Sequence, residues 1–239
     1  MGAKRAKKQK TIDTNFSNVV EMNKFKKDVV EILPRNINQE TYVLNLLDQN
    51  KDIVFGIGPA GTGKTLLAVQ VAVKLFKEKE VDKIVITRPA VSVDEDLGAL
   101  PGTLEEKMAP WTRPIFDVLK EYFTSYEIEG MINEGVLEIA PLGYMRGRTF
   151  KKTYIVADEM QLATMSQMKM LLTRIGEYSF MSVTGDLAQS DRLENNGLKD
   201  FLDRYSSMDS DRIEITTFAY QDIERHPVIE DVLKSYGEF

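Results

Sequence analysis

Short runs of apolar, often β-branched residues alternate along the chain with longer segments in which apolar residues recur every three or four positions. The short runs predict buried strands, and the longer segments predict amphipathic helices. After residue 63, for example, Leu67, Val71 and Leu75 recur at four-residue spacing. The expected strands cover 52–57, 83–87, 136–139, 153–157, 180–184 and 212–216, and the expected helices cover 19–33, 39–47, 64–78, 103–123, 161–175, 196–206 and 220–236. This alternation predicts an α/β fold, a mostly parallel sheet with helices on both faces.

Length and charge suggest one domain with a basic extension. The chain has 239 residues, of which 43% are hydrophobic, which is enough for one sizeable core. The formal net charge is −6, yet the first ten residues include Lys4, Arg5, Lys7, Lys8 and Lys10. We therefore expect residues 1–18 to form a disordered basic tail and residues 19–239 to form a single domain. The tail is either a solvated leader or a contact for a phosphate backbone.

Composition also excludes several classes of site. The chain has no Cys and one His, so disulfides, thiol chemistry and a zinc site are not expected. No apolar run reaches the roughly 18–20 residues that a membrane span needs, and none follows the basic start as in a secretory signal. We therefore expect a cytoplasmic protein without a membrane partner.

A glycine-rich loop stands between the expected strand at 52–57 and the expected helix at 64–78. It reads Gly58, Pro59, Ala60, Gly61, Thr62, Gly63, Lys64 and Thr65, which fits the phosphate-loop pattern G-x-x-x-x-G-K-[ST]. Such glycines let backbone N–H groups face a phosphate at a helix N-terminus. Lys64 is expected to reach the β- and γ-phosphates as a catalytic residue, and the Thr65 hydroxyl to ligate Mg²⁺. The expected cofactors are ATP and Mg²⁺.

Two carboxylates follow the apolar strand at 153–157. A hydrolytic phosphate-loop enzyme needs an Asp there to hold the Mg²⁺ shell and a Glu beside it to orient or deprotonate the attacking water. Asp158 and Glu159 match these two roles, although a bare Asp-Glu pair also commonly marks a helix N-terminus. Gln161 is expected to face water or nucleotide, the alternative being simple exposure.

The strand at 180–184 also ends in polar groups. Thr184, Asp186 and Gln189 could face the γ-phosphate and sense its presence, with Gln189 as a catalytic candidate. The alternative is a local turn closed by the Asp side chain. The residues themselves do not decide between the two.

Five ordered segments, spread over roughly residues 34–236, form a recognisable set. Asn36 and Gln39 are similar to an adenine-reading motif, and the phosphate loop follows them. The other segments are 87–91 with 97–102, 141–149 leading into 158–161, and 185–189 followed by 225–227. Together these segments resemble the PhoH family, single-domain relatives of the superfamily 1 helicases. The resemblance implies a RecA-like core, ATP hydrolysis, activity linked to RNA or helicase-like activity, and a ring that is commonly hexameric.

An oligomer is expected on physical grounds as well. A superfamily 1 motor closes ATP between two RecA-like domains, and this chain has room for one. A neighbouring subunit would then supply the missing wall, including a transition-state arginine. Arg174 and Arg225 are the candidates, and a structural ion-pair role is the alternative for each.

A basic segment with an aromatic residue suggests a nucleic-acid surface. Arg88, Arg146 and Arg148 are expected to hold phosphates. Tyr144 would offer a stacking face for a base. The alternative is a basic, solvated hairpin.

The leading functional hypothesis is an ATP-driven helicase or remodeller acting on single-stranded RNA or DNA. One rival is a phosphotransferase with a small acceptor, which Glu159 disfavours because it points to water as the acceptor. A second rival is an assembly switch in which ATP sets only the oligomer contacts. A GTPase is disfavoured because no guanine-reading Asn-Lys-x-Asp motif follows the loop.

Overall fold

The structure is a computed structural model of the chain. It describes residues 29–89, 104–190, 195–208 and 210–224, together with Val228 and Ser235, and for residues 104–111 it describes the backbone alone.

A six-stranded sheet forms the centre of the molecule, and every strand pair in it is parallel. The strands are β1 (Ile53–Ile57), β2 (Lys83–Arg88), β3 (Leu137–Pro141), β4 (Thr153–Ala157), β5 (Phe180–Gly185) and β6 (Ile213–Thr217). Their order across the sheet is β3-β2-β4-β5-β1-β6. Because all strands run the same way, the loops that follow β1, β4 and β5 meet at one edge of the sheet.

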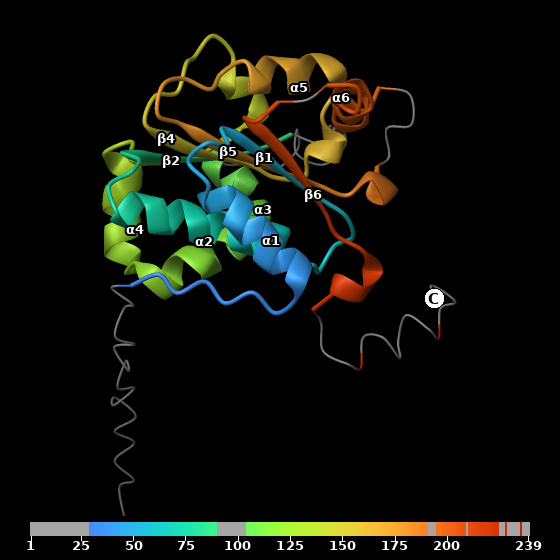
Figure 1. The fold of residues 1–239 in the computed structure, drawn as a ribbon. Helices are drawn as coiled ribbons and strands as arrows, with labels where there is room; N and C mark the ends of the chain where they lie inside the picture. The colour runs from blue at the N-terminus through green and yellow to red at the C-terminus, as the bar shows by residue number, and fades with distance from the viewer. Residues whose placement is uncertain are drawn as a thin grey trace, which may run out of the picture.

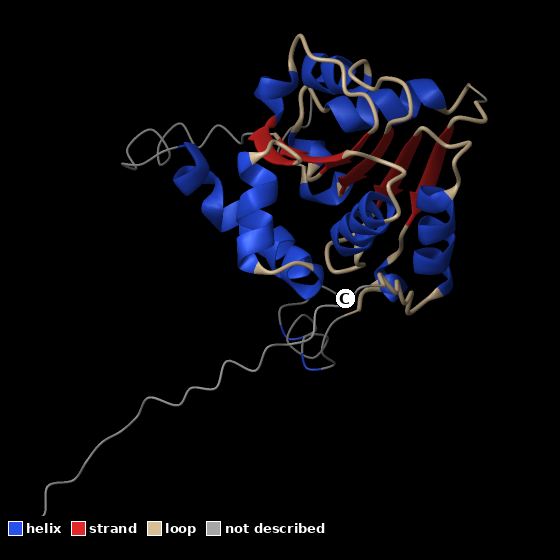
Figure 2. Ribbon diagram, turned by 90° about the vertical axis from the view of Figure 1, so that its left-hand side faces the viewer, coloured by secondary structure: helices blue, strands red, loops and turns tan. Residues whose placement is uncertain are grey.

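Helices cover both faces of this sheet (Figures 1 and 2). One face carries α1 (Ile37–Leu47), α2 (Lys64–Lys77), α3 (Leu104–Tyr122) and α4 (Ser125–Asn133), and the other carries α5 (Met165–Leu172) and α6 (Gly197–Tyr205). Short 3₁₀ turns η1 (Leu142–Met145), η2 (Met160–Leu162), η3 (Leu187–Gln189) and η4 (Tyr220–Asp222) follow the ends of β3, β4, β5 and β6.

Two apolar cores lie on the two faces of the sheet. Successive side chains of a strand point to opposite faces, so Val54 packs with α1 and α2 while Phe55 packs with α5 and α6. In β4, Tyr154 and Val156 join the first core and Ile155 joins the second. Burial on both faces explains why the strands read as continuous apolar runs rather than alternating ones.

The predicted α/β class, a parallel sheet between two helical layers, is confirmed. All six predicted strands are present, each within two residues of its expected bounds. The helices expected at 39–47, 64–78, 103–123 and 196–206 are present as α1, α2, α3 and α6.

Three helix predictions need correction. The helix expected over 19–33 is wrong for residues 29–33, which are not helical, and residues 19–28 lie outside the described part of the chain. The helix expected over 161–175 begins only at Met165, because Thr164 caps it in a reciprocal pair with Gln167. Of the helix expected over 220–236, the described start is a single 3₁₀ turn, and residues 225–227 and most of those beyond lie outside the description.

One helix was not expected at all. The helix α4 starts from Thr124, whose hydroxyl accepts from the backbone N–H of Glu127, while the Glu127 carboxylate accepts from the backbone N–H of Thr124. This pair is a capping box, which the Thr-x-x-Glu spacing in the sequence signals. None of the helices in the described ranges is both long and apolar enough to cross a bilayer.

Candidate nucleotide-binding site

The glycine-rich loop joins the carboxyl end of β1 to the first turn of α2. Three of its glycines have positive φ, 145° at Gly58, 84° at Gly61 and 83° at Gly63, and side chains are disfavoured there. A Cβ at Gly58 would lie 2.3 Å from the carbonyl oxygen of Phe218. The segment after β6 also braces the loop, since the Glu224 N–H donates to the Gly61 carbonyl at 3.0 Å. The conformation of the loop is therefore fixed by its glycines and its neighbours, and its N–H groups lie at the start of α2.

Lys64 holds its ammonium group inside this loop, with 8% of the residue exposed. Its Nζ donates to three oxygens of the loop, namely Gly58 O at 2.7 Å, Pro59 O at 2.6 Å and Thr62 Oγ1 at 3.1 Å. Burial lowers the pKa of Lys64 from its usual value, and the carboxylates of Asp186, Glu159 and Asp158 oppose that shift. A negatively charged group entering the loop would therefore meet a cation that is already desolvated.

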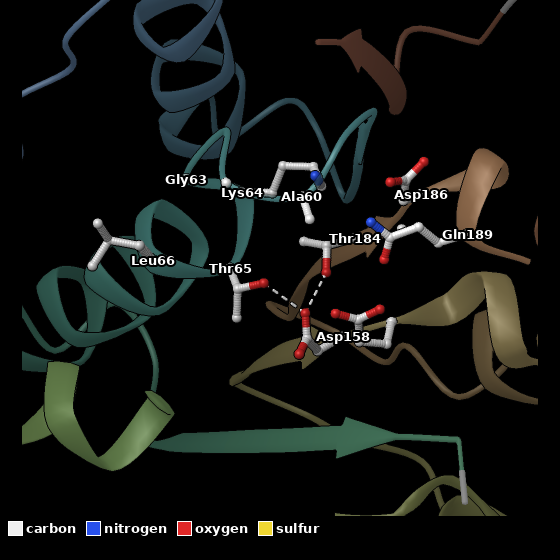
Figure 3. Close-up of a pocket in the computed structure, with 12 residues that line it drawn as sticks. Ala60, Gly63, Lys64, Thr65, Leu66, Asp158, Thr184, Asp186 and Gln189 are labelled. Carbon is white, nitrogen blue, oxygen red and sulfur yellow. Dashed lines mark hydrogen bonds between the residues drawn. The ribbon is translucent and has the colours of Figure 1, made fainter. Parts of the chain in front are cut away.

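Asp158 connects three elements of the site, as Figure 3 shows. Its Oδ1 accepts hydrogen bonds from the Thr65 hydroxyl of α2, at 2.6 Å, and from the Thr184 hydroxyl of β5, at 2.7 Å. The residue is 6% exposed. Hydroxyl and carboxylate oxygens are the ligands that Mg²⁺ prefers.

This donor set fits a magnesium ion that is shared with a nucleotide. Mg²⁺ usually keeps several waters and binds through one or two protein oxygens together with phosphate oxygens. In the described ranges, no three or more His, Cys, Asp or Glu side chains are grouped so that they could hold a metal ion. Thr65 and Asp158 would hold the ion.

Glu159 follows Asp158 and is one of the few residues other than glycine with positive φ, at 54°. That left-handed conformation is uncommon for a residue with a long side chain. Its Oε2 accepts a 2.5 Å hydrogen bond from Nε2 of Gln161. Glu159 lines the same cavity as Lys64 and Thr65, so the predicted general base lies at the predicted site.

The loop after β5 forms the opposite wall of this cavity, which has a volume of about 230 Å³. Thr184, Asp186 and Gln189 all line it. Asp186 also closes a local turn, since its Oδ1 accepts from the Ala188 N–H at 3.0 Å. The two alternatives drawn from the sequence are therefore compatible: Asp186 closes a turn and faces the cavity.

A second cavity of about 530 Å³ adjoins the phosphate loop. It shares Gly61, Gly63 and Leu66 with the first cavity. Its remaining lining comes from α1, α2, α3 and the segments beside them: Glu31, Leu33, Pro34, Arg35, Gln39, Leu67, Gln70, Glu121, Tyr122 and Glu224. The two cavities therefore adjoin the same loop.

Gln39 and Asn36 occupy different positions at this second cavity. Gln39 lines it, donates from Nε2 to the Thr62 carbonyl at 3.1 Å and accepts at Oε1 from the Arg35 N–H at 2.9 Å. An amide group has two N–H donors and two acceptor lone pairs, so capacity for a ligand remains. Asn36 instead caps α1 by accepting from the Gln39 N–H, and its Nδ2 donates to the Asp222 carbonyl. The structure therefore places Gln39 at the cavity and gives Asn36 a capping role.

The four residues expected at a nucleic-acid surface separate into two groups. Arg148 donates to both carboxylate oxygens of Glu138 and lies over the Phe150 ring, 4.6 Å from its centroid. The hydrogen bonds from Arg148, and after them the one from Lys83, lower the pKa of Glu138 to about 2. By contrast, Tyr144 is 61% exposed.

Arg146 is also exposed, and Arg88 is half-buried at the end of β2. Arg146 and Tyr144 thus face solvent in the segment after β3, while Arg148 is held by an ion pair within the fold. The predicted basic surface therefore keeps Tyr144 and Arg146 as solvent-exposed side chains and Arg88 as a half-buried one, while Arg148 is occupied by its ion pair.

Arg174 lies far from the phosphate loop of its own chain. Its carbonyl accepts from the Phe150 N–H ahead of β4, which places it at the amino end of the strands. The strands span roughly 20 Å between that edge and the site, at about 3.3 Å per residue. Its guanidinium donates to the carbonyls of Met170 and Arg148 and to the Thr173 hydroxyl. Arg225 lies outside the described residues.

The sequence carries no motif for the wall of the second cavity that α2 and α3 form. Gln70 of α2 donates to the Tyr122 hydroxyl at 3.1 Å, and both residues line the cavity with Leu66. Their spacing carries no motif, because α2 and α3 come together only in the folded chain. The side chain of Gln161, expected to face water or nucleotide or to be exposed, is in fact buried.

A family model and several similar proteins indicate the same family for this chain. The family model described as PhoH-like protein matches residues 31–237. A PhoH-like protein of Mycobacterium tuberculosis (strain ATCC 25618 / H37Rv) is 44% identical over 210 residues, which cover 87% of this chain and 58% of that protein. A PhoH-like protein of Bacillus subtilis (strain 168) is 43% identical over 206 residues, covering 85% and 63%. Protein PhoH of Escherichia coli (strain K12) is 39% identical over 217 residues, covering 88% and 60%.

The chain therefore spans about three fifths of the length of these curated relatives. Among solved structures, it resembles the Sulfolobus solfataricus SWI2/SNF2 ATPase core in complex with dsDNA, with a TM-score of 0.39 and 14% identity over 66% of this chain and 33% of that one. The family model spans the phosphate loop and Asp158, and the relatives match most of the chain: this chain belongs to the PhoH-like protein family.

Proposed function

We propose that this protein binds and hydrolyses ATP with Mg²⁺. The observation that supports this most is the convergence of Thr65 and Thr184 on one carboxylate oxygen of Asp158, beside the phosphate loop. Three elements from distant parts of the sequence thereby bring magnesium-type ligands to the N-terminus of α2, where a phosphate chain binds best.

The two cavities suggest how the nucleotide lies. The triphosphate would occupy the smaller cavity between Lys64 and the carboxylates, and the adenosine would occupy the larger one beside Gln39. Gln39 has an amide that can pair with adenine N6 and N7, the pairing that Gln makes with adenine elsewhere. Leu66 and Tyr122 supply apolar surface for the base.

In hydrolysis, Lys64 and Glu159 would have separate roles. Lys64 would exchange its loop contacts for oxygens of the β- and γ-phosphates and offset their charge. Glu159 would take a proton from water as the water oxygen attacks the γ-phosphorus. The bond from that phosphorus to the bridging oxygen breaks, and its electron pair remains with ADP. A bound Mg²⁺ would neutralise charge on the β- and γ-phosphates.

The wider activity we propose is that of an oligomeric helicase or remodeller of RNA or other single-stranded nucleic acid. Exposed Tyr144 and Arg146 support it, because a base of a single strand can stack on an aromatic ring and a backbone phosphate can pair with a cation. Arg88 would extend this surface. The residues that the structure describes form one sheet of this type, so a neighbouring copy, most simply in a hexameric ring, would complete the site.

Within such a ring, Arg225 or Arg174 would act on the neighbour's nucleotide. Arg174 could do so only from another subunit, since it lies at the opposite edge of its own sheet. Mixing inactive Lys64→Ala protein with inactive Arg225→Ala or Arg174→Ala protein should restore part of the activity, because some interfaces then pair an intact loop with an intact arginine. Subunit exchange without rescue would contradict an arginine acting between chains.

One experiment separates the proposal from its two rivals. ATP turnover is measured with and without single-stranded RNA and DNA, and oligomer mass is measured in the same buffer. Turnover that RNA or DNA stimulates supports a motor or remodeller. Turnover that needs a small acceptor supports a phosphotransferase, and slow, unstimulated turnover with ATP-dependent assembly supports a switch.

A further inference from the structure

Gln161 stands between the two walls of the phosphate cavity, although it does not line that cavity. The residue is 1% exposed. Its Nε2 donates to Glu159 Oε2, and its Oε1 accepts the backbone N–H of Asp186 at 3.2 Å. One amide group thus joins the carboxylate after β4 to the loop after β5.

The space for this bridge is fixed by its neighbours. A Cβ on Gly185 would lie 3.1 Å from Gln161 Oε1 and 2.5 Å from a methyl carbon of Leu198. The glycine before Asp186 therefore lets the amide approach the backbone N–H. A larger residue there would displace the bridge.

The backbone of Gln161 is held as well. Its carbonyl accepts from the Ser190 hydroxyl at 3.2 Å, and that hydroxyl accepts from Asn196 Nδ2 at 2.7 Å. Asn196 is the residue that caps the start of α6. Because both ends of the Gln161 residue are fixed, its amide is a rigid support rather than a mobile group.

Glu159 benefits directly from such a support. Its backbone is in the left-handed region, so its side chain leaves the main chain in an unusual direction. Hydrogen bonding at Oε2 limits the rotation of the carboxylate and leaves Oε1 as the oxygen available to water. Among the residues that the structure describes, no hydrogen bond to Oε1 is present.

We propose that Gln161 is a positioning residue for hydrolysis, which orients Glu159 and ties it to the Asp186–Gln189 wall that faces the γ-phosphate. A shift of that wall on phosphate binding would then move the carboxylate. This inference rests on the proposed ATPase function and adds a residue that does not touch the nucleotide.

Two substitutions separate the contacts of the bridge. Gln161→Met keeps the approximate volume and removes both hydrogen bonds. Gln161→Glu keeps an acceptor for Asp186 but places a second carboxylate beside Glu159. Both variants should bind ATP within about threefold of the wild type. Their kcat should fall by about 10- to 100-fold, the range that partners orienting metal ligands typically carry. Gln167→Met is the matched control. The side chain of Gln167 caps α5, so this variant should leave kcat unchanged.

A double substitution tests whether Gln161 acts through Glu159. In single-turnover reactions, Gln161→Met should cost less than about threefold further in a Glu159→Gln background, because residues that act as a unit are not additive. Full additivity would overturn the proposal, as would an unchanged kcat in folded Gln161→Met protein. If the wild type itself binds ATP without hydrolysing it, the proposed function fails. Normal wild-type turnover with an unaffected Gln161 variant refutes only this inference.

Discussion

The hydroxyl of Thr65 donates a 2.6 Å hydrogen bond to Asp158 Oδ1 across 93 positions of sequence. Parallel pairing of the strands makes this contact possible, because the ends of β1, β4 and β5 meet at one edge. Thr184 reaches the same oxygen from β5. A carboxylate with two hydroxyl partners is held in place for a metal ion rather than left to rotate.

Asp158→Asn should raise the Mg²⁺ concentration needed for half-maximal ATP turnover by at least about tenfold, since an amide is a weaker ligand than a carboxylate for a hard cation. The measurement is turnover in a Mg²⁺ titration. Asp200→Asn, on the outer face of α6 where Asp200 pairs with Arg204, is the control and should leave the titration unchanged. Identical Mg²⁺ curves for Asp158→Asn and Glu159→Gln would contradict the division of roles between the two carboxylates.

Glu138 predicts a pH dependence of stability. Hydrogen bonds from Arg148 and Lys83 lower the pKa of Glu138 from its ordinary 4.5 to about 2 in the folded protein. A lowered carboxyl pKa stabilises the fold fully above the unfolded value and loses that contribution as pH falls toward the folded value. The wild type should therefore exceed Glu138→Gln in free energy of unfolding above about pH 5, and the difference should shrink between pH 4.5 and 2. Denaturant titrations of both proteins across that range check this, and a difference that stays constant would refute the ion-pair account.

Arg146 and Arg148 should respond differently to substitution. Arg146→Ala, with its side chain exposed, should weaken binding of single-stranded RNA and lower the salt slope of the affinity by about one unit, while stability is unchanged. Arg148→Ala should lower the thermal midpoint, because Glu138 keeps Lys83 but loses its bidentate partner. RNA affinity at several salt concentrations and thermal unfolding are measured on both proteins. An unchanged salt slope for Arg146→Ala would favour the solvated hairpin.

The positions of the strands could be predicted, because apolar runs followed by loops carry strong local signals. The phosphate loop and Asp158 were found for the same reason: each follows a strand at a fixed spacing. The contacts of Asp158 with Thr65 and Thr184 depend on the order of strands across the sheet, and sequence alone gave only the common edge.

Side-chain partners were harder to foresee. Arg148 and Tyr144 belong to one segment of sequence, but only the fold brings Glu138 beside Arg148 and leaves Tyr144 in solvent. Gln161 was expected to face water or nucleotide, and its burial follows from the approach of the β5 loop over η2. The start of α5 was misplaced because the 3₁₀ turn at 160–162 continues the helical pattern, whereas the capping pair at Thr164 and Gln167 sets the true boundary.

We propose that this site hydrolyses ATP with Glu159 as the base. The most direct test measures ATP binding and phosphate release by the wild type, Lys64→Ala and Glu159→Gln in the same Mg²⁺ buffer. Glu159→Gln should bind ATP as the wild type does and release phosphate about 10²- to 10⁴-fold more slowly, the range that a general base contributes, whereas Lys64→Ala should lose hydrolysis and bind more weakly while still unfolding cooperatively. Near-normal phosphate release by folded Glu159→Gln protein would contradict the account.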